Sequence, residues 1–552
     1  MLRRLLLLGA VLLLAAGAWF GVQARQVRAD LQAAERLADL VEQQAREGTA
    51  GDLRPLQRRA NAAAETTDSL LWRAASHLPV VGGDVQEVRR SAFAVRELSD
   101  RAAPALVQAL RRTDGLMRGG RVDLGALGAL EADVAQAHRV VLQVRRDLRD
   151  ATGHDAVTRH TGRLREQVAD LDEALATAAQ ALAPARGMLG DDGPRRYLVA
   201  VQNNAEARAT GGLVGIVAVV RAERGRLDLV RTVTDDALVH APRPVASDPA
   251  AARTWTGMGS TLAWFDANLT PHVPDAARNL AGLWRAQTGE RLDGVVLLDA
   301  VVLQHLLVKP VRLGATTLSK NDVVDWVARR EYVEHPDPAA RKAHLRDLAE
   351  VLFAQVKALR DPEPLLEAAR SGHLFLWSAH AREQALVADH LVGGALPAGQ
   401  SPYLQVLTQN FGGNKLDYYL HRAVRVRRAG DAYEVAVTLT NRAPKGLPAY
   451  VTSRPDRSDL AGSGQARVGL SLYAARGAWF GPWVADRHRL TVRYDVDHGL
   501  TLGTTIVELP RGASITVTTR VHMADGELTY RQQPLVRPDR LRLEVPHRVV
   551  GD

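Results

Sequence analysis

The stretch that decides the fold runs from residue 197 to residue 233, YLVAVQNNAEARATGGLVGIVAVVRAERGRLDLVRTV. Its first five residues and the apolar runs at 213–221 and 227–233 each predict a strand. The turn sequence Glu223-Arg-Gly-Arg226 predicts a hairpin between the second and third strands. The polar residues 202–212 are expected to form a loop at the carboxyl end of the first strand.

The sequence beyond this stretch alternates predicted strands with predicted helices. Strands are expected at 294–299, 374–377 and 403–407, and amphipathic helices at 321–332 and 338–359. Alternation of this kind indicates a sheet covered by helices. We therefore expect a central α/β mixed-sheet domain over residues 191–422, which begins at the turn sequence Asp191-Asp-Gly-Pro194.

The segments on either side of this domain have different patterns. Residues 25–190 carry apolar side chains at helical spacing and predict a helical stalk or bundle of about five helices. His138 falls in one apolar stripe and is interpreted as a core histidine. Residues 423–552 alternate apolar and polar side chains with period two, which predicts a β-sandwich domain. The sandwich either binds glycan or protein, or serves as a passive spacer.

Residues 1–24 predict a membrane anchor. The uncharged apolar stretch from Leu5 to Val22 follows Arg3 and Arg4, and at about 1.5 Å per residue it is long enough to cross a bilayer. The arginines are expected to stay in the cytoplasm, which places the bulk of the chain outside it as a single-pass cell-membrane protein. A signal peptide cleaved after Ala24 is the alternative. The expected fold class is multidomain α+β, with an N-terminal transmembrane helix, a helical stalk or bundle, a central α/β domain and a C-terminal β-sandwich.

The composition excludes several classes of protein. The chain has 552 residues, of which 46% are hydrophobic and 24% charged, and these are ordinary proportions for a globular protein of several domains. The net charge of +9 is spread among acidic residues, so no nucleic-acid partner is expected. Cysteine is absent, which excludes disulfides, thiolate metal sites and a catalytic thiol. Phosphate-binding, zinc-protease and nucleophile-elbow motifs are also missing, and we predict no cofactor and no metal site.

Polar side chains of the predicted loop form the first candidate ligand site. Asn203, Asn204, Glu206 and Arg208 follow the first strand, and a glycine pair permits close approach of a ligand to the backbone. The acidic pair Asp235-Asp236 ends the third strand, so we expect these side chains to meet at the carboxyl edge of one sheet. The alternative is that the amides satisfy backbone groups in a tight turn while Glu206 pairs with Arg208.

The motif QNNAEARATGG, followed by a strand, an ERG turn and a strand, resembles the bacterial domain of unknown function 4012 (DUF4012). Further matching motifs are WFDAN at 264–268, Pro274-Asp275, Thr288-Gly289, LDGVVLLD at 292–299, Leu318 to Val323 and QNFGGNKLD at 409–417. The resemblance covers residues 190–425, together with the preceding anchor and helices. The family has no established activity, so the resemblance implies the kind of protein and not its chemistry.

The order of strand, polar loop, strand, hairpin and Arg-containing helices is also similar to LytR-CpsA-Psr proteins, which move polyprenyl-pyrophosphate-linked glycopolymers onto the cell wall. This resemblance implies a pyrophosphate clamp of Arg329, Arg330 and Arg341, with Arg208 contributed by the loop and Asp235 or Asp236 as the strand-end acid. The alternative for the clamp arginines is a solvated helix face.

The chain departs from the LytR-CpsA-Psr pattern at three places. Asn203-Asn204 stands where an Asp is expected, Thr210-Gly-Gly212 where Arg-Ser-Asp is expected, and His344 where a second downstream Arg is expected. The missing carboxylates are the ligands that a phosphate-bound Mg²⁺ would use, so metal-assisted transfer is disfavoured.

From these patterns we expect a membrane-anchored extracytoplasmic protein that binds or assembles cell-envelope polysaccharide or its lipid-pyrophosphate carrier. One alternative is a LytR-CpsA-Psr-like glycopolymer phosphotransferase, and another is a structural scaffold that recruits envelope partners. The expected partners are membrane lipid, through the N-terminal helix, and a lipid-linked glycan. Enzymatic turnover and oligomeric state are left open by the sequence.

Overall fold

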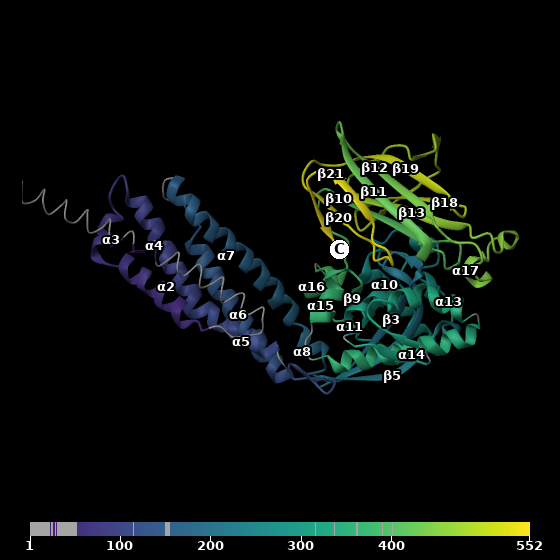
Figure 1. Ribbon diagram of the computed structural model, residues 1–552, viewed down its shortest axis with the longest axis horizontal. Coiled ribbons are helices and arrows are strands. Elements are labelled where there is room, and N and C mark those ends of the chain that lie inside the picture. The colour runs from purple at the N-terminus through teal and green to yellow at the C-terminus, as the bar shows by residue number, and fades with distance from the viewer. Residues whose placement is uncertain are drawn as a thin grey trace, which may run out of the picture. The chain divides into compact units, whose positions relative to one another are not determined.

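The structure is a computed structural model of the chain (Figure 1). It describes residues 52–113, 115–149, 155–307, 309–314, 316–335, 337–359, 363–388, 390–399 and 401–551, together with residues 23, 26, 27 and 29. The chain divides into two compact units. The first comprises residues up to 116 and residues 122–186, and the second comprises residues 117–121 and 187–552. We call them the helical unit and the main unit.

The predicted transmembrane helix at Leu5 to Val22 lies outside the described residues. Within the described part of the chain, no helix is both long enough and apolar enough to cross a membrane. Helix α7 (Asp155–Leu182), for example, interleaves its apolar positions with charged ones, as a helix with one buried face does. The predicted fold class, which included a transmembrane helix, is therefore corrected to a mixed α/β multidomain fold with several sheets.

The helical unit is built from long helices that pack through apolar stripes. Besides α7 it contains α2 (Arg54–Thr67), α3 (Leu70–Ala75), α4 (Gly82–Glu97), the π-helical turn η1 (Leu98–Ala102), α5 (Ala103–Thr113) and α6 (Leu124–Asp147). Asp123 caps α6 by accepting hydrogen bonds from two backbone N–H groups. The stripe predicted around His138 is buried at Val134, Val141 and Val144, whereas the ring of His138 itself bonds Asp172 of α7 at 3.1 Å.

A seven-stranded mixed sheet forms the centre of the main unit, in the order β1-β2-β5-β4-β3-β6-β9. The strands are β1 (Met117–Arg118), β2 (Arg121–Val122), β3 (Arg195–Arg208), β4 (Gly211–Glu223), β5 (Arg226–Thr234), β6 (Gly294–Asp299) and β9 (Leu374–Ser378). Strand β3 pairs antiparallel with β4 and parallel with β6. The predicted ERG hairpin joins β4 to β5, with Arg224 and Gly225 in the left-handed region that this turn requires.

Helices cover both faces of the central sheet because its strands are apolar on both faces. Leu198, Val217 and Val295 pack with α10 (Val273–Thr288) in one core. Helices α11 (Ala300–Leu306) and α14 (Pro338–Ala358) contact the strands as well. The shorter helices of this region are α8 (Ala185–Met188), α9 (Arg253–Gly257), α12 (Val323–Asp325), the π-helical turn η4 (Trp326–Arg330), α13 (Glu331–Glu334), α15 (Glu363–Arg370) and α16 (Ala381–Val387).

Two further sheets of the main unit form a sandwich. One has the order β17-β18-β13-β10-β20-β22, and the other the order β16-β15-β19-β12-β11-β21, with β14 paired to β19. Their bounds are β10 (Tyr403–Asn410), β11 (Leu420–Ala429), β12 (Ala432–Asn441), β13 (Ala466–Arg476), β14 (Trp479–Phe480), β15 (Val484–Ala485), β16 (His488–Arg489), β17 (Arg493–Asp497), β18 (Leu500–Leu509), β19 (Ser514–His522), β20 (Leu528–Arg531), β21 (Arg540–Glu544) and β22 (His547–Val550). Strand β10 thus belongs to the sandwich, although it precedes the predicted domain start at residue 423.

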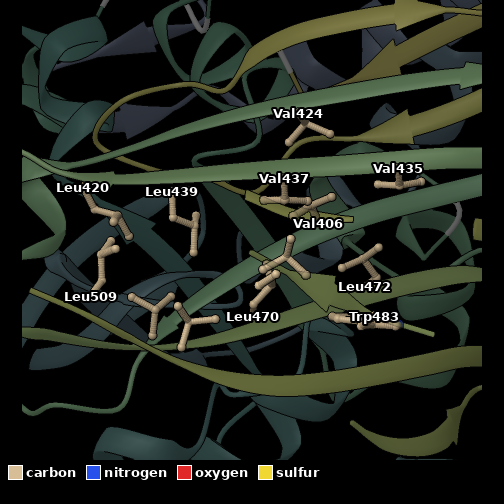
Figure 2. Close-up of a cluster of buried hydrophobic side chains, with 14 of the residues drawn as sticks. Val406, Leu420, Val424, Val435, Val437, Leu439, Leu470, Leu472, Trp483 and Leu509 are labelled. Carbon is tan, nitrogen blue, oxygen red and sulfur yellow. The ribbon is translucent and has the colours of Figure 1, made fainter. Parts of the chain in front are cut away.

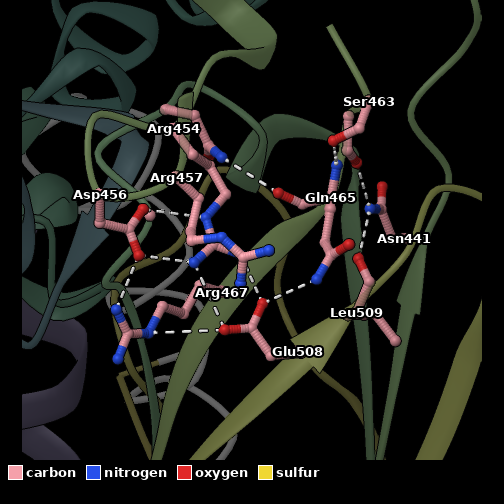
Figure 3. A network of polar contacts seen from close by, with 12 residues as sticks. Asn441, Arg454, Asp456, Arg457, Ser463, Gln465, Arg467, Glu508 and Leu509 are labelled. Carbon is pink, nitrogen blue, oxygen red and sulfur yellow. Dashed lines mark hydrogen bonds and ion pairs between the residues drawn. The ribbon is translucent and has the colours of Figure 1, made fainter. Parts of the chain in front are cut away.

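The alternating side chains of these strands fill one core between the two sheets (Figure 2). Val424 and Val437 enter it from the second sheet, and Val406 and Leu470 enter it from the first. An ion-pair network joins the loop before β13 to strand β18 (Figure 3). In it Arg454, 3% exposed, binds both Asp456 and Glu508, and hydrogen bonding to Arg454 lowers the pKa of Asp456 to about 2.

Candidate functional site

The residues predicted as a loop at 202–208 instead continue strand β3. The register shifts after Val201 and after Asn203, so that Gln202, Asn203, Ala207 and Arg208 pair with the start of β4 and residues 204–206 form a bulge between them. At Gly212 an added Cβ would lie 2.0 Å from the carbonyl oxygen of Asn203, and Gly211 has a φ of 140°. The glycine pair is therefore required by the tight connection between two strands and not by the approach of a ligand.

Glu206 and Arg208 are buried and bonded to protein groups. The carboxylate of Glu206 binds Lys415 and, at 3.4 Å, Arg208. Arg208 also donates to the carbonyl oxygens of Phe265 and Asn410, at 3.0 and 3.1 Å. Burial acts to raise the pKa of Glu206, but the opposing effect of the charges on Lys415 and Arg208 is larger. The pKa therefore lies below its usual value, and the group is held as a carboxylate. The alternative interpretation of this segment, in which Glu206 pairs with Arg208, is the one that the structure supports.

The motif at 409–417 supplies three partners of this segment, Asn410, Lys415 and Asp417. Asp417 accepts hydrogen bonds from the backbone N–H of Ala207 at 3.0 Å and from Asn410 at 2.6 Å. Burial raises the pKa of Asp417 to about 6. Two motifs that carry the family resemblance therefore join the central sheet to the sandwich. We call this cluster the motif lock; it consists of Glu206, Arg208, Asn410, Lys415 and Asp417.

The two asparagines lie at the carboxyl end of the parallel pair β3 and β6. Asn203 binds the hydroxyl of Tyr332, and Asn204 donates to Asp299 at 2.7 Å. Asp299 also caps α11 and binds His373 at 2.6 Å. The side-chain oxygen of Asn204 is buried and has no hydrogen-bond partner among the described residues.

Asp235 and Asp236 lie at the same edge of the sheet as the asparagines, since β3 and β5 are both antiparallel to β4. They are about half exposed, and both pair with Lys342 of α14, at 3.4 and 3.3 Å. A hydrogen bond from Thr234 lowers the pKa of Asp236. Arg208, which we expected beside them, pairs with Glu206 and lies 3.7 Å from Asp266.

The three arginines of the predicted clamp have separate partners. Arg329 pairs with Asp325 at 2.5 Å and Arg330 with Glu334 at 2.7 Å, each one helical turn away. Arg341 is 4% exposed; it donates to the carbonyl oxygen of His335 and lies 4.1 Å from the ring centre of Tyr450. For Arg329 and Arg330 this is the arrangement of a solvated helix face, and for Arg341 it is that of a packed side chain.

A mainly apolar pocket lies between the sheet and α14. Its cavity volume is about 40 Å³, or about 520 Å³ when the open solvent at its mouth is counted, and only Gln202, Asn203 and Asp299 among its fourteen lining residues are polar. The apolar lining includes Val201 and Leu298, which pair at the ends of β3 and β6. From α14 it includes Leu345, Leu348, Ala349 and Leu352. We call this space the α14 pocket.

Gly215 opens the α14 pocket on the side of β4. It is the extra residue of a bulge, because Ile216 pairs with Val201 while Val214 pairs with Gln202. A Cβ added at Gly215 would meet no atom within 4 Å. We did not predict this pocket from the sequence, although the spacing of Leu345, Leu348 and Leu352 indicates an apolar helix face and Gly215 interrupts an apolar strand.

A second cluster that the sequence did not identify consists of His272, Asp275 and His498, whose ligand atoms all lie within 4.8 Å of one another. The backbone N–H of Leu396 donates to Nδ1 of His272 at 2.9 Å, so the neutral ring carries its proton on Nε2. A metal-bound histidine instead donates from its second ring nitrogen. His498 bonds Asp275 at 2.7 Å and stacks on His272. The cluster is therefore satisfied by hydrogen bonds, and we assign no metal to it.

Comparisons with known proteins bear on the family alone. The comparison with curated proteins found no match, and neither did the comparison with solved structures. The likeness to LytR-CpsA-Psr proteins is not supported by these findings. A family model described as "Protein of unknown function (DUF4012)" matches residues 192–332, which contain β3 to β6 and the asparagine pair. The predicted family is thereby confirmed: residues 192–332 of this chain are a DUF4012 domain.

Proposed function

We propose that this protein binds an amphipathic lipid phosphate, of the class of the polyprenyl-pyrophosphate carriers of envelope glycans, without transferring it. The observation that carries the proposal is the α14 pocket, a mainly apolar space at the carboxyl edge of a mixed sheet. Ligands of α/β proteins commonly bind at this edge. An aliphatic chain suits the leucine-rich lining, in which Gln202, Asn203 and Asp299 are the only polar residues.

The polar groups beside the pocket suit a phosphate head group. Lys342 precedes the lining residue Leu345 by three positions, so it lies one turn away on the same face of α14. Its ammonium group is held at the carboxyl edge by Asp235 and Asp236. Asn203 lines the pocket at the same edge and carries an amide that can donate to phosphate oxygens. The head group would bind between Lys342 and Asn203, where a phosphate would replace Asp235 and Asp236 as the partner of Lys342.

The arrangement of charges favours binding over phosphotransfer. A transferase needs several cations directed at one phosphate, whereas Arg329, Arg330 and Arg341 are engaged with separate partners. The carboxylates Asp235 and Asp236 are likewise paired with Lys342. The alternative of a structural scaffold that recruits envelope partners does not explain the α14 pocket. The extracytoplasmic location predicted from the sequence stays a prediction and is not needed for this proposal.

The test is titration calorimetry of the full chain with farnesyl pyrophosphate. The variant Gly215→Leu fills the pocket from a position where an added Cβ meets no atom within 4 Å, so it should weaken binding at least about tenfold. The matched control is Gly162→Leu in α7, where an added Cβ also meets nothing within 4 Å, and this variant should bind as the natural chain does.

Inorganic pyrophosphate separates the two parts of the ligand. It should bind more weakly than farnesyl pyrophosphate, and Gly215→Leu should leave its binding unchanged. Absence of farnesyl pyrophosphate binding by the natural chain would overturn the proposal, and so would equal binding by both glycine variants.

A further inference from the structure

Helix α3 of the helical unit and the turn that joins it to α4 carry several exposed aliphatic side chains. Within residues 70–81, five large hydrophobic residues are exposed: Leu70 by 79%, Leu71 by 44%, Leu78 by 52%, Val80 by 74% and Val81 by 43%. The described part of the chain has seventeen such residues in all, so almost a third of them fall in one short segment. We call residues 70–81 the apolar tip. Large exposed apolar side chains gathered in one short segment are typical of an interaction site.

The apolar tip is held firmly from its inner side. Trp72 is 2% exposed and packs in a core with Val85 and Ala92 of α4. Backbone hydrogen bonds from Leu78 to Ala75 and from Gly82 to Leu78 define the turn. A side chain at Gly82 would come within 2.6 Å of the carbonyl oxygen of Ser76. The exposed aliphatic groups therefore project from an ordered turn.

The charges around the apolar tip have a small positive excess. Residues 69–83 contain Arg73 and His77 and no Asp or Glu, and they are flanked by Asp68 and by Asp84 in the first turn of α4. Arg73 and Arg89 share one carboxylate, that of Asp68, at 3.8 and 3.1 Å. With Asp84 and Arg90 of α4 included, three arginines stand against two carboxylates, which leaves a net charge of +1 near the exposed leucines and valines.

We propose that the apolar tip inserts into the surface of a lipid layer that carries anionic head groups. Aliphatic side chains with a basic rim suit such a surface, where apolar groups enter by about 5–10 Å and arginines meet lipid phosphates. Protein interfaces are instead enriched in aromatic residues at their core, and the only aromatic residue of the tip besides His77, Trp72, is buried. This inference rests on the helical unit alone and does not depend on the proposed function of the α14 pocket.

The absence of cysteine from the chain permits a direct test. Val80→Cys in the full chain is labelled with an environment-sensitive fluorophore and mixed with vesicles of phosphatidylcholine and phosphatidylglycerol, about three to one. We expect a blue shift of the emission and quenching by nitroxide-labelled lipids. The matched control is Val239→Cys, at an exposed valine of the main unit, which is 64% exposed and should show neither effect. Adding Leu78→Asp to the Val80→Cys chain should reduce the blue shift.

Three outcomes would overturn the proposal. The first is an unshifted emission at position 80, and the second is an equal shift at positions 80 and 239, which indicates general adsorption. The third is a label at position 80 that is shielded from iodide before vesicles are added, because another segment of the chain or a second copy then covers the tip. Equal shifts with pure phosphatidylcholine vesicles would contradict the role of the basic rim.

Discussion

The motif lock and the α14 pocket lie at neighbouring parts of the same strand, yet their chemistry is opposite. In the motif lock each charged side chain has a protein partner: Glu206 lies between Lys415 and Arg208, and Asp417 accepts hydrogen bonds from Ala207 and Asn410. In the α14 pocket the leucines of α14 line a space that opens to solvent. Glu206 and Arg208, two of the residues predicted to bind a ligand, thus help to hold two sheets together, and the pocket lies beside them. Polar residues in a sequence motif therefore indicate a ligand site only when the folded protein leaves them without protein partners.

The largest effect is expected when the motif lock is broken at Lys415. Lys415→Met leaves the carboxylate of Glu206 buried without its main partner, which should lower the free energy of unfolding by about 3–5 kcal/mol. Urea denaturation followed by circular dichroism measures the loss. The double variant Glu206→Gln with Lys415→Met should recover part of it. A single variant as stable as the natural chain would show that the lock contributes no stability.

A pH-dependent effect of somewhat smaller size is expected at Glu331. Burial raises the pKa of this carboxyl to about 8, and neither of its oxygens has a hydrogen bond within the described chain. Its folded pKa is above the unfolded value, so its contribution to stability is lost as pH rises from about 4.5 to about 8. The variant Glu331→Gln cannot ionise, so it should not lose this stability as the pH rises.

The measurement is the free energy of unfolding of both chains at several pH values. The variant should gain a few kcal/mol relative to the natural chain between pH 5 and pH 9, because one pKa unit corresponds to about 1.36 kcal/mol. A constant difference between the two chains across this range would contradict the raised pKa.

A moderate effect is expected when the α14 pocket is enlarged. Leu348→Ala should cost about 2 kcal/mol, the lower end for a core leucine, because the side chain already borders empty space on one side. Thermal unfolding measures the cost. If Leu348→Ala instead costs as much as a fully packed leucine, about 4 kcal/mol or more, the pocket is closed in solution and the comparison with the motif lock fails.

The smallest effect is expected at Arg330. This arginine is exposed and paired with Glu334 on its own helix, so Arg330→Ala should change the free energy of unfolding by less than about 1 kcal/mol. It should also leave farnesyl pyrophosphate binding unchanged. A tenfold loss of that binding would restore the predicted arginine clamp and contradict the separate roles assigned here.

Local patterns were sufficient to predict much of the fold. Strand β4, the ERG hairpin and strand β5 follow from apolar runs and one glycine in the left-handed region, and these are properties of adjacent residues. The period-two alternation of residues 433–440 likewise matches the burial of Val435, Val437 and Leu439 in the sandwich. The family motifs within 192–332 are also local, and their match was confirmed.

The sites depended on partners that are distant in the sequence. Residues 202–208 have the composition of a loop but continue a strand, in which Lys415, Asn410 and Asp417 satisfy polar groups of residues 206–208 from about 200 positions away. The predicted arginine clamp does not form because two of its arginines have other protein partners. Arg329 pairs with Asp325 and Arg330 with Glu334, each on the same helical segment.

The sequence by itself determined the family, the strand pattern of the central sheet and the alternation of the sandwich, because each rests on periodicity or on short motifs. Only the tertiary structure decided that the motif residues are buried in a lock, that a bulge at Gly215 and the apolar face of α14 enclose a pocket, and that the apolar tip is uncovered. The physical reason is that burial and pairing are properties of the neighbours that folding brings together. A polar side chain has the same identity whether it faces a ligand or a lysine two hundred residues away.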